Sequence, residues 1–205
     1  MSWLSDLEQL LTEFLNNMGV WAPFFCCALI FLEGILAFLP LFVFVAFNIL
    51  ALSNIFGTFF GTILGVVLSW IFSVLGSFTM FFLVRKILSG RFRNKIKNSP
   101  KVIKFMNVLD KLTYSQLVLI TSIPFSPSFF INLGAGLSTV NYKKYFCALL
   151  IGKFAEMIFL GYVGVSLLEC LTEPLALIKV AVIMLIGYMI SIVVNKKFNL
   201  DERFE

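Results

Sequence analysis

Apolar and polar residues recur with helical spacing at the start of the chain. Residues 3 to 18 place an apolar face opposite a polar face that carries Asp6, Glu8, Glu13 and Asn16. A stripe with this periodicity is typical of an amphipathic helix. The pattern therefore predicts that residues 1–18 form a helix lying on a membrane surface.

The next stretch, residues 18 to 52, is almost continuously apolar. Its 35 residues exceed the roughly 20 that one spanning helix needs. It is interrupted by Glu33-Gly34 and by Pro40, and proline has no backbone N–H with which to continue a helix. We expect this segment to bend inside the bilayer and not to cross it as one straight helix.

Three later stretches have the length and composition of spanning helices: residues 57–84, 145–168 and 175–194. In the first of them, Gly57, Gly61 and Gly65 lie four residues apart, a small-xxx-small pattern that lets helix backbones approach closely. We expect this glycine face to pack on another helix. The chain is predicted to be an all-α integral membrane protein with about three full spanning helices.

A second interrupted segment runs from residue 114 to residue 137. Its polar and helix-breaking residues are Thr121, Ser122, Pro124, Ser126, Pro127 and Asn132. Nine of the sixteen Lys and Arg residues lie between residues 85 and 111, before this segment, and Lys143 and Lys144 follow it. The positive-inside rule places both flanks in the cytoplasm. The segment is therefore expected to enter and leave on the cytoplasmic side, as a re-entrant hairpin.

The two interrupted segments share a spacing. Asn48 follows Pro40 by eight residues, and Asn132 follows Pro124 by eight residues. Each segment is followed by a long apolar helix. If the first hairpin enters from outside and the second from the cytoplasm, the two halves form an inverted repeat, which places a substrate path near the bilayer midplane.

Composition supports a membrane protein and narrows its chemistry. Sixty per cent of the 205 residues are apolar, and the mean hydropathy is +0.99, so lipid is the main solvent. No polar linker divides the chain, and residues 1–205 are read as a single membrane domain: an interfacial helix at 1–18, a core at 19–170, and a last spanning helix with a cytoplasmic tail at 171–205. Histidine is absent and the four cysteines lack metal-ligand spacing, so we expect no metal, no cofactor and no enzymatic activity.

Charged residues inside the apolar stretches are the sharpest candidates for function. Glu33 lies within apolar sequence, where an ionised carboxylate is costly unless it is paired, hydrated or protonated. An interfacial position with the carboxylate reaching head groups is the alternative. Lys153 and Glu156 lie three residues apart, on one helix face, and can neutralise each other.

The basic segment between residues 85 and 111 is expected to contact anionic lipid head groups, through Arg85, Arg91 and Arg93 among others. Basic charge beside a membrane anchor does not by itself indicate nucleic-acid binding.

Several ordered motifs together resemble a known family. They are Phe31-Leu-Glu33-Gly34 followed by Pro40; Gly57, Gly61 and Gly65 leading to Arg85; Ile123-Pro124-Phe-Ser-Pro127 followed by Asn132 and Gly134-Ala-Gly136; and Gly152-Lys153. Over roughly residues 20 to 170 the chain resembles the DedA family, also called VTT-domain or SNARE-associated membrane proteins, in its Tvp-like and TMEM-like branch.

This resemblance implies two opposed re-entrant hairpins and movement of lipids between leaflets, as a scramblase or as a flippase for polyprenyl-phosphate carriers. It assigns the lipid path to Glu33 in the first hairpin and to Pro124, Pro127 and Asn132 in the second. Many family members have an arginine where this chain has Thr121. Because threonine carries no charge, the departure puts proton coupling and phosphate binding at that position in doubt, and Lys153 is a candidate substitute.

The leading hypothesis is a lipid path through the hairpins, lined by residues that include Glu33, Pro40, Asn48, Thr121, Ser122, Ser126, Asn132 and Lys153. The rival hypotheses are a proton- or ion-coupled transporter of a small solute and a non-transporting membrane organiser. We expect membrane lipids as partners in a cell membrane, with the basic loop and the C-terminus in the cytoplasm. Assembly into a homo-oligomer is left open.

Overall fold

The computed structural model describes residues 13, 18–36, 39–88, 100–124, 128–169, 182, 185 and 189. The expected amphipathic helix at 1–18 and the expected spanning helix at 175–194 therefore fall almost wholly outside the described residues. So do Arg91, Arg93, Ser126 and Pro127.

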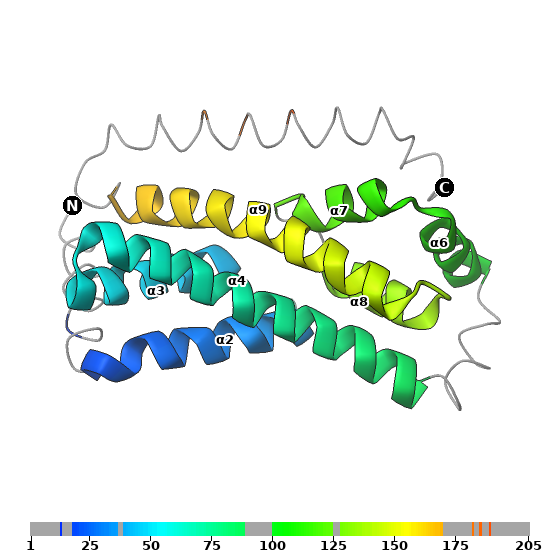
Figure 1. Ribbon diagram of the computed structural model, residues 1–205, viewed down its shortest axis with the longest axis horizontal. Coiled ribbons are helices and arrows are strands. Elements are labelled where there is room, and N and C mark those ends of the chain that lie inside the picture. Colours follow the sequence, from blue (N-terminus) through cyan, green and yellow to red (C-terminus); the bar gives the residue numbers. More distant parts are fainter. Residues whose placement is uncertain are drawn as a thin grey trace. The chain divides into compact units, whose positions relative to one another are not determined.

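Every element of the described residues is a helix (Figure 1). In chain order they are η1 (Gly19–Trp21), α2 (Ala22–Leu36), α3 (Leu41–Phe56), α4 (Thr58–Leu83), the π-helical turn η2 (Val84–Leu88), α6 (Pro100–Lys111), α7 (Tyr114–Ser122), α8 (Ser128–Leu137) and α9 (Tyr142–Glu169). The prediction of an all-α protein is confirmed.

Three stretches of these helices are long and apolar enough to cross a membrane: Gly19–Leu36, Thr58–Lys86 and Tyr142–Ser166. The last two match the predictions at 57–84 and 145–168. The first was expected to form part of a bent segment, and by length it can span the bilayer alone. The expectation of about three long apolar helices is confirmed.

The breaks between the short helices fall at prolines. Pro40 directly precedes α3, and Pro124 lies between the end of α7 and the start of α8. The expected interruption at Glu33-Gly34 is wrong, because α2 continues through both residues to Leu36. Gly57 separates α3 from α4 with a φ of +81°, a backbone conformation that favours glycine.

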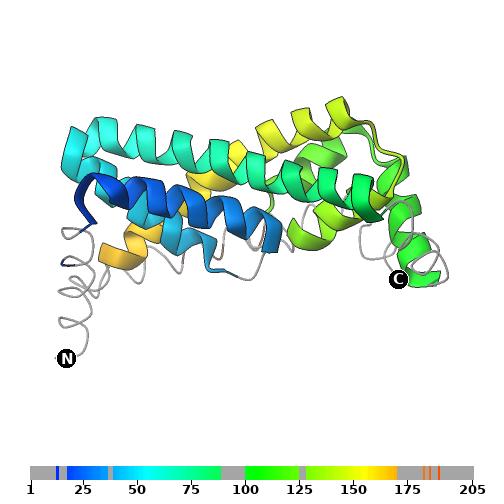
Figure 2. The same ribbon diagram turned by 90° about the horizontal axis from the view of Figure 1, so that it is seen from below.

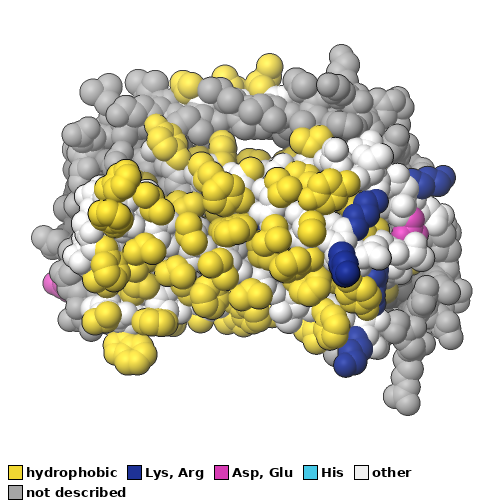
Figure 3. Space-filling view, in the orientation of Figure 1, with side chains coloured by type: hydrophobic (Ala, Val, Ile, Leu, Met, Phe, Trp, Pro, Cys, Tyr) yellow, Lys and Arg dark blue, Asp and Glu magenta, His cyan; other side chains and the backbone are white. Residues whose placement is uncertain are grey.

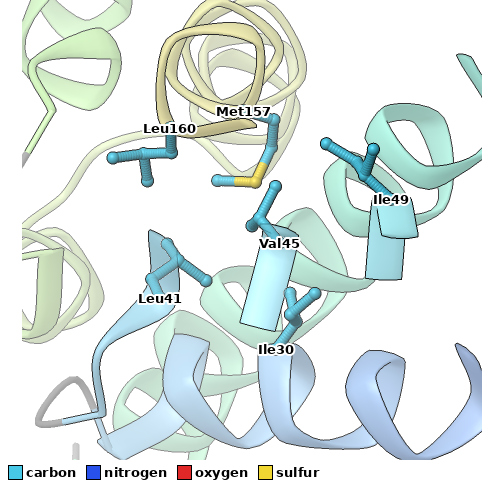
Figure 4. Close-up of a cluster of buried hydrophobic side chains, with 6 residues drawn as sticks. All are labelled: Ile30, Leu41, Val45, Ile49, Met157 and Leu160. Atoms are coloured by element: carbon cyan, nitrogen blue, oxygen red, sulfur yellow. The ribbon is translucent and has the colours of Figure 1, made fainter. Parts of the chain in front are cut away.

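The chain divides into two compact units, and α2, α4 and α9 each contribute residues to both. Unit 1 comprises residues 1–30, 40–72 and 157–186. Its core is a cluster of buried aliphatic side chains and one methionine from α2, α3 and α9: Ile30, Leu41, Val45, Ile49, Met157 and Leu160 (Figure 4). The three α3 members are spaced four residues apart, so one face of α3 supplies the centre of this core.

In unit 1, α3 packs tightly against α4 at two glycines. A Cβ added at Gly65 would lie 2.7 Å from the Ile49 Cα, and one added at Gly61 would collide with the backbone of Ser53. The small residues thus let the two helix backbones touch, as the glycine spacing predicted. Gly57 differs from them, because nothing lies within 4 Å of its Cβ position.

Unit 2 comprises residues 31–39, 73–156 and 187–205. In this unit α2 lies alongside α4 (Figures 1 and 2). Their backbones come into direct contact at Gly34 and Gly76, where neither helix has a side chain to keep them apart. A Cβ added at Gly34 would lie 2.7 Å from the Ser77 backbone nitrogen. Gly34 is therefore required by a close helix crossing and does not form a turn.

The described surface in Figure 3 is mostly hydrophobic, as expected for a protein surrounded by lipid. Basic side chains gather in unit 2, where α4 ends, α9 begins and α6 lies. The described basic residues outside the interior are Arg85, Lys86, Lys111, Lys143 and Lys144.

Candidate functional site

Asn48 lies at the centre of a buried polar cluster in unit 1. Its side chain is fully buried, and its amide nitrogen lies 3.2 Å from the Gly65 carbonyl and 3.0 Å from the Ser69 hydroxyl. The Cys27 sulfur lies 3.7 Å from the same nitrogen. An amide has two N–H groups, so Asn48 ties α3 firmly to α4. Its Oδ1 has no hydrogen-bond partner within the described part of the chain.

Asn132 has the corresponding position in unit 2, eight residues after a proline. It is 1% exposed, its amide nitrogen donates to the Gly34 carbonyl at 3.3 Å, and the Tyr145 hydroxyl donates to its Oδ1 at 2.6 Å. The side chain thus links α8 to α2 and α9. Each proline break is therefore followed by a short helix whose buried asparagine binds the backbone of a long helix.

A buried ion pair lies in α9. The Lys153 ammonium is 2.6 Å from a Glu156 carboxylate oxygen, and both side chains are almost completely buried. The contact is ionic and not a well-aligned hydrogen bond. Lys153 also donates to the Ser128 hydroxyl, at 3.1 Å, at the start of α8. The pairing predicted from the three-residue spacing is present, and it supplies the neutralisation that buried charges require.

Glu33 belongs to the same unit and is buried, with 7% of its surface exposed. Lys153 and Glu156 both act on it electrostatically. Its Oε2 has no hydrogen-bond partner among the residues that the structure describes. The carboxylate thus lies inside the protein near the α9 ion pair, and the two carboxylates and one ammonium form a cluster that we call the charge triad.

Thr121 has a structural role. Its hydroxyl lies 2.9 Å from the Leu117 carbonyl and 3.2 Å from the Ala148 carbonyl. Gly152 packs directly against it, because a Cβ added at Gly152 would collide with the Thr121 hydroxyl. α7 and α9 therefore meet at a small threonine and a glycine, and this contact has no space for a long side chain unless the helices separate.

Arg85 is held by α8. Its guanidinium donates to the carbonyls of Ala135, Gly136, Ser138 and Val140, at 2.6 to 3.3 Å. It also stacks over the rings of Phe81 and Tyr142. The last carbonyls of a helix have no partner within it and carry partial negative charge. The predicted head-group residue Arg85 thus caps the C-terminus of α8.

The other described residues that were predicted to line the lipid path lie at the proline breaks before α3 and after α7. The Ser122 hydroxyl donates to the Leu119 carbonyl at 2.8 Å, Pro40 is exposed, and Pro124 is half-buried.

Three fully buried serines on α4 were not predicted from the sequence: Ser69, Ser73 and Ser77. They continue the four-residue spacing of the earlier glycines, a signal that was available in the sequence.

Comparison with known proteins identifies the family. The sequence model of the VTT domain matches residues 35–166. The chain is 31% identical over 183 residues to the uncharacterized membrane protein YhjE of Bacillus subtilis, covering 89% of this chain and 84% of that protein. It is 30% identical over 94 residues to the uncharacterized protein YqeD of Bacillus subtilis, covering 46% and 45%. No solved structure matches the chain. Together with its three long apolar helices, these matches show that the chain is an integral membrane protein and belongs to the VTT-domain (DedA) family.

Proposed function

We propose that this protein moves lipids between the two leaflets of a membrane. The observation that carries the proposal is the pair of short apolar helices that follow the proline breaks. α3 has 16 residues and α8 has 10, which correspond to about 24 and 15 Å, against a hydrocarbon core of about 30 Å. Neither helix is long enough to cross the bilayer alone.

Buried polar groups accompany both short helices. Asn48 and Ser69 lie in unit 1, and the charge triad lies with Asn132 in unit 2. A polar head group entering hydrocarbon alone loses its hydrogen bonds to water at a cost of several kcal/mol. Polar side chains at membrane depth lower that cost while the acyl chains stay in the surrounding lipid. In each unit, these groups are the proposed contacts for a head group.

The proposed topology follows from charge. The two short helices enter as re-entrant hairpins from opposite sides, and the basic end of unit 2 faces the cytoplasm of a cell membrane, where it contacts anionic head groups. The activity is transport and involves no covalent chemistry. Exposed cations that can contact head groups include Lys86, Lys111 and Lys143, whereas the Arg85 guanidinium is bound to the Ala135 and Gly136 carbonyls of α8.

The test reconstitutes the full chain in liposomes that contain a fluorescent lipid. A membrane-impermeant reductant then destroys the label in the outer leaflet, and continued loss of fluorescence measures exchange from the inner leaflet. We expect Asn48→Leu and Asn132→Leu to slow exchange, because each removes a buried polar group. Phe59→Leu is the matched control, since that side chain is 72% exposed and belongs to the lipid-facing surface.

The result that contradicts the proposal is an exchange rate equal to that of protein-free liposomes for every labelled lipid tested. Size-exclusion profiles of each variant show whether a slow rate reflects loss of the fold. Variants that remain folded and exchange lipid at the wild-type rate would remove the two asparagines from the path.

The buried charge triad favours a second candidate, a cation-coupled transporter of a small solute. Its signature is solute uptake that follows an imposed pH or sodium gradient and is lost in Glu33→Gln. Lipid exchange without such uptake would exclude it.

A further inference from the structure

One end of unit 1 presents exposed aromatic rings. It consists of η1, the first turns of α2, the last turn of α3 and the first turn of α4, which lie at the same end of the unit in Figures 1 and 2. We call this end the aromatic tip; its exposed rings include Trp21, Phe24, Phe56 and Phe60. Trp21, Phe24 and Phe60 are each at least 65% exposed. Exposed apolar patches of this kind mark sites that contact a membrane or another protein.

The aromatic tip carries no charged side chain. No Lys, Arg, Asp or Glu occurs between Glu13 and Glu33, or between Glu33 and Arg85. The exposed polar side chains at the turn between α3 and α4 are those of Asn54 and Thr58, an amide and a hydroxyl. Turns in water are usually rich in polar and charged residues. An uncharged turn beside a tryptophan is typical of the layer where lipid meets water, because the indole ring is apolar with one polar N–H.

The rings of the tip are held by helical backbone. Phe56 is the last residue of α3 and Phe60 is the third residue of α4, so Gly57 alone connects the two helices. Its φ of +81° favours glycine, and it allows the chain to reverse within one residue. The turn therefore supplies no loop that could fold over these rings and cover them.

The length of α4 places the tip at the level of lipid head groups. The apolar stretch Thr58–Lys86 has 29 residues, which correspond to about 43 Å of helix. The hydrocarbon core of a bilayer is about 30 Å thick, and the head-group layers bring the total to about 40–45 Å. Spanning helices tilt by at most about 40°, and this stretch would need more than that to fit within the hydrocarbon. If Lys86 lies in one head-group layer, Thr58 therefore reaches the other.

We propose that the aromatic tip is a lipid-binding surface that inserts into the head-group layer of the leaflet opposite Lys86. The rings contact the upper parts of the acyl chains, and the side chains of Asn54 and Thr58 form hydrogen bonds with head groups. Because the tip is uncharged, it binds zwitterionic and anionic lipids alike. The exposed lysines of unit 2 differ in this respect, since they attract anionic lipids.

Continuity with the lipid-facing surface favours lipid over a protein partner. Ile63, Ile71 and Leu75 are exposed along α4, and no charged residue separates them from the tip. A patch that binds another protein typically has a polar rim around an apolar centre. The tip instead continues directly into the surface that faces the acyl chains.

The experiment measures quenching of tryptophan fluorescence in the full chain, reconstituted in phosphatidylcholine vesicles. Trp3→Phe/Trp70→Phe leaves the native Trp21 as the single probe, so the tip itself is unchanged. The quenchers are lipids brominated near the head group, lipids brominated near the end of the acyl chain, and acrylamide in the water. Two reference variants lack the native tryptophans and carry one elsewhere: Ile71→Trp, exposed in mid-span on α4, and Asn107→Trp, exposed on α6.

We expect Trp21 to lose more fluorescence to bromine near the head group than to bromine near the acyl end, and to be quenched weakly by acrylamide. Ile71→Trp should show the opposite order for the two brominated lipids, and Asn107→Trp should be quenched most by acrylamide. Replacing part of the phosphatidylcholine with phosphatidylglycerol should leave the Trp21 pattern unchanged, because the tip has no charge. A second tip probe, Phe60→Trp without the native tryptophans, should give the same order as Trp21.

The inference is overturned if acrylamide quenches Trp21 as strongly as Asn107→Trp, which would place the tip in water. Protection of Trp21 from all three quenchers also overturns it, as does quenching by brominated lipid that increases when the protein is diluted in lipid. Both results would indicate that a protein, such as a second copy of the chain, covers the tip. Opposite orders for Trp21 and Phe60→Trp would show that the tip is not one surface. These measurements do not involve lipid exchange, so their outcome is independent of the proposed function.

Discussion

Arg85→Ala is expected to be the most destabilising single change at the basic end of unit 2. The guanidinium donates to four carbonyls in and just after α8, three of them at 2.6 to 2.8 Å. It also covers the rings of Phe81 and Tyr142. Removing it leaves several partly buried carbonyls without partners and removes the cation that offsets the helix dipole.

The magnitude follows from these contacts. A hydrogen bond to a charged group contributes about 1.5–3 kcal/mol, and such bonds from one side chain are not additive. Leaving a buried carbonyl without its donor costs about 1–3 kcal/mol, and four part-buried carbonyls lose Arg85 together. Because these carbonyls are only partly buried and the losses are not additive, we expect Arg85→Ala to lower the free energy of unfolding by about 3 kcal/mol. Arg85→Lys should recover part of this loss, because an ammonium keeps the charge but lacks the planar fork of donors.

The assay is denaturant unfolding of the purified protein in detergent, together with hydrogen exchange of the α8 amides. Lys86→Ala is the matched control, because Lys86 is the next residue, is exposed, and contacts the Phe82 ring at 5.6 Å. That contact contributes about 0.5–1 kcal/mol. Equal losses for Arg85→Ala and Lys86→Ala, with unchanged exchange in α8, would refute the assignment of Arg85 as the cap of this helix.

Three further predictions follow from the packing of unit 2. Gly152→Ala should destabilise the protein by about 1–3 kcal/mol, and adding Thr121→Ala should restore part of the loss in a double-mutant cycle. Lys153→Met should lower the free energy of unfolding by about 3–5 kcal/mol, because it leaves a buried carboxylate without its counter-charge. In denaturant unfolding, the double variant Lys153→Met/Glu156→Gln should be more stable than Lys153→Met alone. Equal stabilities would contradict the ion pair. Tyr145→Phe should lower the free energy of unfolding by about 1–3 kcal/mol, because the buried Asn132 Oδ1 loses the hydroxyl that donates to it. An unchanged unfolding curve would show that this hydrogen bond does not contribute to stability.

The breaks and the long helices could be predicted from local sequence. Pro40 and Pro124 mark helix boundaries because proline lacks an N–H, and the apolar stretches at 57–84 and 145–168 are long enough to span a membrane. The pairing of Lys153 with Glu156 was equally local, since both lie on one helix face. These features depend on residues close together in the chain.

Contacts between residues far apart in the chain could not be predicted in this way. Glu33-Gly34 was read as an interruption because glycine weakens helices, yet Gly34 is required where α2 crosses Gly76. Arg85 is predicted to contact head groups because it heads a basic segment, and that pattern does not predict its hydrogen bonds to carbonyls about 50 residues further along the chain. Hydropathy and charge patterns do not contain such pairings.

The candidate site was predicted in part. Asn48 and Asn132 were found from their spacing after proline, and their buried hydrogen bonds give that spacing a physical reason. The buried serines of α4 were missed because serine is common in spanning helices and its hydroxyl usually bonds to its own helix. Ser73 and Ser77 become notable only once their lack of partners is seen.

Movement of lipid between leaflets can be measured as the rate of transbilayer exchange of a fluorescent lipid in liposomes that contain the wild-type chain. We expect fluorescence to fall beyond the outer-leaflet fraction, at a rate that rises with the amount of protein and is lower in Asn132→Leu but not in Phe59→Leu. Exchange no faster than in protein-free liposomes, with correctly folded protein at every protein-to-lipid ratio and for every lipid tested, would contradict it.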